Sequence, residues 1–131
     1  MIWYVAVGGA AGSVVRFLLS GFVQQRLGAG FPYGTFIINI TGSFLLGFLL
    51  RYALGSTTFS PQTRALLTTG FCGGYTTFST YTYETATLVL DGQYGKAGVY
   101  AAFSVVLALV GAFGGFALAR QVLTLREHLG G

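Results

Sequence analysis

Four long apolar segments, separated by short polar or glycine-rich breaks, follow one another through this chain. They run from about residue 2 to 22, 33 to 50, 64 to 90 and 98 to 118. A helix needs about 20 mainly apolar residues to cross a bilayer, so each segment is long enough to span a membrane. Of the 131 residues, 53% are hydrophobic and only 8% are charged, too few to cover a soluble protein's surface. The pattern predicts an all-α membrane protein with four transmembrane helices.

These segments account for most of the chain, so we expect residues 1–131 to form a single transmembrane domain. The side of the amino terminus would hold Arg51, Arg64, Arg120 and Arg126, and the opposite side Arg26 and Lys96. Four cations against two is a bias of two, so the positive-inside rule predicts orientation only weakly. Insertion in both orientations, or in one weakly specified orientation, would explain this bias. The net charge of +4 is spread along the chain, so we expect no nucleic-acid partner.

The third segment contains GFCGGYTTFSTYTYE, from Gly70 to Glu84, and is too long and too polar for an ordinary span. Glycine weakens a helix by about 1 kcal/mol per residue relative to alanine. Backbone groups freed at membrane depth are tolerated only inside protein or beside a water-filled cavity. The stretch therefore predicts two half-helices joined near residues 73–77. A continuous helix in which the glycines form a packing notch is the alternative.

Small residues recur four positions apart in several segments, a spacing that allows helices to approach closely in lipid. The pairs are Gly8/Gly12, Ser43/Gly47, Gly70/Gly74 and Gly111/Gly115. We expect most of them to pack helices within one subunit. Because four helices of this length enclose little space by themselves, the chain also favours an oligomer.

Polar side chains line one face of the second segment, where Thr35, Asn39 and Ser43 follow one another at helical spacing. An amide in hydrocarbon needs partners, so Asn39 either lines a pore or makes an interhelical hydrogen bond that holds the bundle together. Tyr100 and Ser104 form a similar pair on the fourth segment and could line the same path or bond a neighbouring backbone.

An aromatic pair and one cation complete the candidate groups. Phe78 and Tyr81 stand three residues apart, and aromatic rings have a positive edge that can face an anion, although ordinary packing is the commoner role. Arg16, inside the first segment, could attract anions or extend toward an interface. The chain has no clustered metal ligands, catalytic triad or phosphate loop, so we do not expect an enzyme.

Three motifs resemble the Fluc fluoride-channel family, also called CrcB. They are GGAAGSVVRF (Gly8 to Phe17), GTFIINITGSFLLGF (Gly34 to Phe48) and GFCGGYTTFSTYTYE, in the family's order and spacing. The resemblance implies an antiparallel, dual-topology homodimer in the cytoplasmic (inner) membrane, surrounded by lipid. Its two pores would passively export cytoplasmic fluoride and so lower its toxicity.

The resemblance also implies roles for individual residues. A structural sodium ion (Na⁺) would sit at the dimer centre, held by the main-chain carbonyls of Gly73 and Thr76 from both subunits. Asn39, Phe78, Tyr100, Ser104 and Arg16 match positions of the family's pore and first span. With the polar face of the second segment, the expected fluoride path comprises Asn39, Phe78, Tyr81, Thr35, Ser43, Tyr100, Ser104 and Arg16.

Two positions depart from the family pattern. Tyr81 stands where the family usually has phenylalanine, and its hydroxyl could donate to an anion, alter the rate or shift the preferred binding position. Ala108 shortens the polar row on the fourth segment.

Two rival functions remain open. A proton-coupled exporter of the small multidrug type also has four short helices, but it needs a membrane carboxylate, and the first segment has no Asp or Glu. A purely structural membrane protein would use every polar group for packing.

Overall fold

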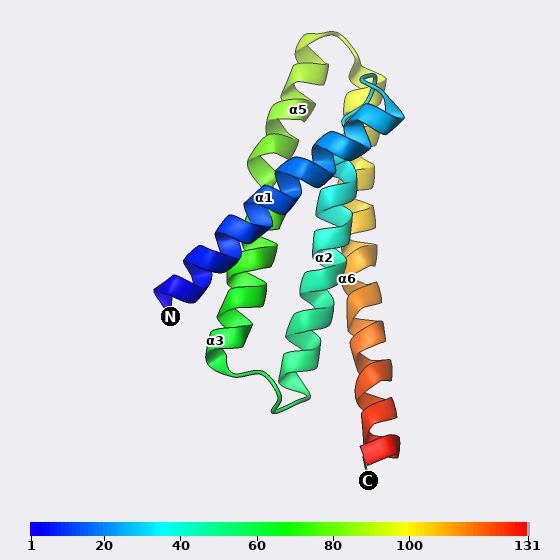
Figure 1. Ribbon diagram of the computed structural model, residues 1–131. Coiled ribbons are helices and arrows are strands. Elements are labelled where there is room, and N and C mark those ends of the chain that lie inside the picture. Colours follow the sequence, from blue (N-terminus) through cyan, green and yellow to red (C-terminus); the bar gives the residue numbers. More distant parts are fainter. Residues whose placement is uncertain (131) are drawn as a thin grey trace.

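The computed structural model describes residues 1–130, and all regular secondary structure in that range is helical. The elements are α1 (Ile2–Leu27), α2 (Tyr33–Leu54), α3 (Pro61–Arg64), the π-helical segment η1 (Ala65–Cys72), α4 (Gly73–Tyr75), α5 (Phe78–Leu90) and α6 (Tyr94–Gly130). In space they form four rods, because α3, η1, α4 and α5 continue one another (Figure 1). The prediction of an all-helical protein is confirmed.

The rods run alternately up and down. Both termini and the α2–α3 connection lie toward one end, and the α1–α2 and α5–α6 connections lie at the other (Figure 1). Three helices, α1, α2 and α6, are long and apolar enough to cross a membrane. The chain is therefore a multi-pass membrane protein.

Helices extend past the spans expected from hydropathy. α1 continues to Leu27, and the side chain of Gln24 ties its end to the following loop. The Gln24 amide donates to the carbonyls of Gly28 and Phe31 and accepts from the Gly34 N–H. α6 continues to Gly130, and its 37 residues correspond to about 55 Å, longer than the hydrocarbon core. α6 is therefore long enough for its carboxy-terminal end, which carries Arg120, Arg126 and His128, to extend beyond a hydrocarbon core.

Glycines bring the backbones of neighbouring rods together. A Cβ added at Gly12 would overlap the Phe71 carbonyl and lie 2.9 Å from the Tyr75 nitrogen. A Cβ at Gly115 would meet the backbone of Phe44, on α2. These contacts join α1 to the η1–α4 rod and α2 to α6, so these spaced glycines pack helices within one subunit.

Candidate functional site

The rod formed by α3 to α5 leaves helical geometry at two residues. Thr76 has φ −87° and ψ 157°, and Thr77 has φ −150° and ψ 118°, both extended conformations. Gly73, by contrast, is helical, with φ −63° and ψ −39°. The glycines were expected to cause an interruption, but they are not where the backbone leaves the helix. Gly74 instead leaves room for α1, since a Cβ there would overlap the Gly9 carbonyl.

Asn39 of α2 makes two hydrogen bonds to the backbone of Thr77, the second extended residue. Its Nδ2 donates to the Thr77 carbonyl at 2.9 Å, and its Oδ1 accepts from the Thr77 N–H at 2.8 Å. The side chain thus replaces the backbone partners that a continuous helix would supply. Of the two roles considered for Asn39, the interhelical hydrogen bond is present. One amide hydrogen is left over, because an asparagine NH₂ carries two donors.

The redirected bonds change which carbonyls at the end of α4 keep a partner. In a continuous helix the Thr77 N–H would serve the Gly73 carbonyl, but here it serves Asn39. The Gly74 carbonyl accepts instead from Arg16 Nε of α1, at 3.0 Å. Arg16 therefore binds the backbone beside the two extended threonines.

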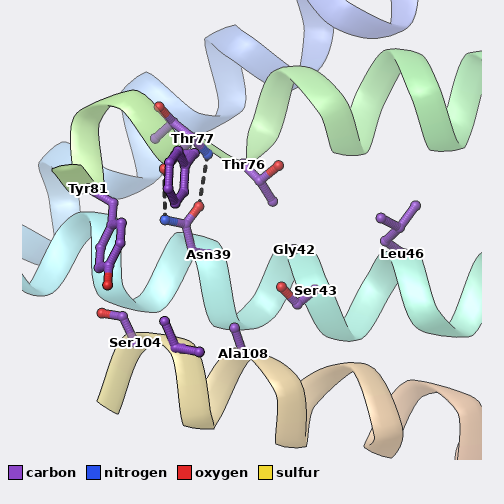
Figure 2. Close-up of a pocket in the computed structure, with 11 residues that line it drawn as sticks. Asn39, Gly42, Ser43, Leu46, Thr76, Thr77, Tyr81, Ser104 and Ala108 are labelled. Atoms are coloured by element: carbon purple, nitrogen blue, oxygen red, sulfur yellow. Dashed lines mark hydrogen bonds between the residues drawn. The ribbon is translucent and has the colours of Figure 1, made fainter. Parts of the chain in front are cut away.

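A cavity of about 250 Å³ lies between α2, this interruption and α6 (Figure 2). Its lining residues are Asn39, Gly42, Ser43, Leu46, Thr76, Thr77, Phe78, Tyr81, Ser104, Val105 and Ala108. Candidate site residues from the second, third and fourth apolar segments therefore lie around one cavity. The side chains that line it are all neutral, and they include hydroxyl, amide, aromatic and aliphatic groups.

Ser104 of α6 is the unusual member of this lining. It is only 6% exposed, yet its hydroxyl oxygen has no hydrogen-bond partner. A buried polar group without a partner costs about 1–3 kcal/mol. Ser104 lines the cavity, but its hydroxyl oxygen is itself shielded from solvent, so an ion would reach it only after a small side-chain rotation.

The aromatic pair forms part of the same wall. Phe78 and Tyr81 have ring centroids 5.7 Å apart and an interplanar angle of 44°. Phe78 is 75% exposed, so this part of the cavity wall is also subunit surface. The hydroxyl of Tyr81 donates to the carbonyl of Ala101 on α6, at 2.8 Å.

Two further candidates, Thr35 and Tyr100, are not among the residues that line the cavity. Thr35 is 7% exposed and Tyr100 is completely buried. The Tyr100 hydroxyl donates to Glu84 Oε1 at 2.9 Å, and its ring contacts that of Tyr81, with centroids 5.4 Å apart. Glu84 was not among the expected site residues, nor was Thr77. Glu84 could have been predicted, because it carries a carboxylate and lies three residues beyond Tyr81. Thr77 takes part through its backbone, so its residue type gives no signal.

The fold and the cavity define a multi-pass helical membrane protein with neutral polar groups gathered where one rod is interrupted. A family model described as "CrcB-like protein, Camphor Resistance (CrcB)" matches residues 3–116. The chain therefore belongs to the CrcB family, as its motifs predicted.

Curated relatives carry a more specific name, "Fluoride-specific ion channel FluC". The relative from Chlorobaculum tepidum is 54% identical over 71 residues, 54% of this chain and 56% of its own length. The relative from Methanopyrus kandleri is 54% identical over 70 residues, covering 53% and 52%. The relative from Aquifex aeolicus is 46% identical over 74 residues, covering 56% and 60%. The match thus spans little more than half the length of each relative.

Proposed function

We propose that this chain forms a fluoride-selective channel that lets cytoplasmic fluoride leave passively through the cytoplasmic (inner) membrane. The names of its relatives and the chemistry of the cavity support this function. The expected path comprises Asn39, Phe78, Tyr81, Thr35, Ser43, Tyr100, Ser104 and Arg16. No reaction is part of this proposal, since transport needs only a selective path.

The observation that carries the proposal is the unpartnered hydroxyl of Ser104. A small, strongly hydrated anion can leave water only where hydrogen-bond donors replace its hydration shell. The Ser104 hydroxyl and the second amide hydrogen of Asn39 are such donors. The positive ring edges of Phe78 and Tyr81 add weaker contacts that suit an anion. All four residues line one cavity.

The cavity also supports a dimer. Phe78 places part of the cavity wall on the subunit surface, where lipid would meet the polar groups of Asn39 and Thr77. Lipid offers those groups no hydrogen bonds, so cover by protein is favoured. We propose an antiparallel, dual-topology homodimer with two pores, each bordered by both subunits. Lipid would surround the remaining apolar faces.

The same proposal gives the third rod its membrane role. Its two parts, η1–α4 and α5, would enter the bilayer from opposite sides and meet at Thr76 and Thr77. Such an interruption is tolerated at membrane depth only if protein covers it. The hydrogen bonds from Asn39 and Arg16 supply part of that cover.

A structural sodium ion at the dimer centre fits the carbonyls at this interruption. The Gly73 carbonyl has lost the N–H of Thr77 to Asn39, and Thr76 lies where the helix ends. A Cβ added at Gly73 would meet nothing within 4 Å, so the backbone there is open to a partner. Carbonyl oxygens are suitable ligands for a hard cation. The ion would give the unpaired carbonyl oxygens a partner and join the two subunits.

Fluoride efflux from proteoliposomes containing Phe78→Ile protein tests the path. Isoleucine keeps apolar bulk but removes the ring edge, so we expect fluoride efflux at least tenfold slower than wild type. Phe113→Ile is the matched control, because Phe113 is 65% exposed on α6 and does not line the cavity. Wild-type efflux from Phe78→Ile vesicles would refute the assignment of Phe78 to the path.

A further inference from the structure

The hydroxyl of Tyr81 is already engaged within the protein. Its Oη donates to the Ala101 carbonyl at 2.8 Å. A tyrosine has one O–H, so the hydrogen given to Ala101 is not available to an anion. The carbonyl can accept this bond beside its helical one because it has two lone pairs. We infer that Tyr81 is a positioning residue that ties α5 to α6, holds its ring as a cavity wall and thereby limits the size of the admitted anion.

The attachment of α5 makes this bond important. Within the subunit no residue of α5 is fully buried, so apolar packing inside the subunit holds this helix less firmly than the others. Hydrogen bonds link it to α6 at two points, from Tyr81 to Ala101 and from Tyr100 to Glu84. The bonds of Asn39 to Thr77 hold the residue just before its start. Removal of one such bond should therefore let α5 shift.

The tether lies beside the groups proposed to contact the anion. Ala101 precedes Ser104 by three residues on α6, about one helical turn. Figure 2 shows the ring of Tyr81 reaching toward α6, with its hydroxyl at the end nearest Ser104. Tyr81 and Ser104 both line the cavity. The bond to Ala101 thus limits how far the ring can retreat from the Ser104 hydroxyl.

If the position of the Tyr81 ring is fixed, small anions can pass more easily than large ones. Fluoride is the smallest halide, and chloride needs a wider space between the ring and the opposite wall. If the hydroxyl is removed, the ring keeps its edge but loses the anchor that opposes its displacement. Discrimination against chloride should then weaken. This inference rests on the proposed fluoride channel for its selectivity consequence, but the tether itself does not.

Tyr81→Phe tests the inference, because phenylalanine keeps the ring and removes only the hydroxyl. In proteoliposomes we expect the ratio of fluoride to chloride permeation to fall about fivefold or more. Amide hydrogen exchange in α5 should also become faster, measured on the purified protein. Tyr94→Phe is the control, since Tyr94 is 70% exposed at the first residue of α6, and it should change neither quantity.

The outcomes separate the inference from the proposed function. A permeation ratio within twofold of wild type would overturn the role in selectivity. Lower fluoride permeation with no relative gain in chloride would also overturn it, since the hydroxyl would then be a direct ligand. Unchanged exchange in α5 would overturn the tether. If the wild-type protein transported no fluoride while α5 exchanged faster in Tyr81→Phe, the proposed function would fail and the tether would stand.

Discussion

The two ends of the third rod are held in place by different forces. At η1 and α4, backbones of neighbouring helices touch through glycines such as Gly12 and Gly74. α5, beyond Thr77, has no fully buried residue and is linked to α6 by side-chain hydrogen bonds. Close packing cannot adjust without backbone movement, whereas a hydrogen bond can be removed by changing one side-chain group. The glycine-packed half therefore serves as scaffold, and the polar half borders the cavity.

The largest effect on stability should come from the glycine-packed half. Gly12→Ala would place a methyl group 2.9 Å from the Tyr75 nitrogen and against the Phe71 carbonyl. Because the obstacle is backbone, α1 must move away, at a cost of about 3 kcal/mol. Thermal unfolding in detergent, followed by circular dichroism, measures the loss. Gly98→Ala is the control, because a Cβ there meets nothing within 4 Å, and its stability should be equal or higher. Equal stability of both variants would contradict close packing at Gly12.

Asn39→Ala should affect both stability and transport. The change leaves the Thr77 N–H and carbonyl without their side-chain partners, at a cost of about 2 kcal/mol. The path also loses an amide donor, so we expect fluoride efflux at least tenfold slower. Ser43→Ala provides the comparison, because Ser43 lines the same cavity and has no role at Thr77. Its unfolding midpoint should stay near wild type. Wild-type stability of Asn39→Ala would remove Asn39 from the support of the interruption.

Ser104→Ala should separate transport from stability. Since the hydroxyl has no partner in the protein, its removal should leave the free energy of unfolding within about 0.5 kcal/mol of wild type or raise it. Fluoride efflux should fall several-fold, because a donor to the anion is lost. Unchanged efflux in vesicles with equal protein content would show that this hydroxyl is not a ligand.

The smallest effect is expected at the projecting end of α6. Arg126 donates to the hydroxyls of Tyr52, Ser56 and Thr58, and all three hydrogen bonds are exposed. Exposed interactions of this kind contribute little, so Arg126→Gln should lower stability by no more than about 1 kcal/mol. Fluoride efflux should match wild type. A large loss of efflux would mean that the path extends to this end of the molecule.

The sequence predicted the helices better than their connections. Hydropathy located all four apolar segments, and helical spacing placed Asn39 and Ser43 on one face that now borders the cavity. The role of the adjacent glycines was only partly predicted, because Gly73 is helical and Gly74 makes room for Gly9 of α1. That contact joins residues far apart in the chain, and local propensity does not reveal it.

The hydrogen-bond partners of side chains at the site also could not be predicted from the local sequence pattern. Arg16 could be recognised as a cation within an apolar segment, but its bond to the Gly74 carbonyl depends on how α1 crosses the third rod. Likewise, the hydroxyl of Tyr81 was expected as a donor to an anion among other roles, and its partner is a carbonyl on α6. In both cases the residue type indicated a polar role, while the tertiary arrangement decided the partner.

The most direct test is a fluoride-electrode recording from proteoliposomes that contain only the wild-type protein. Vesicles loaded with fluoride should release the fluoride down its own gradient, whether or not a proton gradient is present. Matched vesicles loaded with chloride should retain the chloride. Absence of fluoride release would contradict the channel and leave a structural membrane protein. Release that stops when the proton gradient is collapsed would indicate a proton-coupled exporter instead.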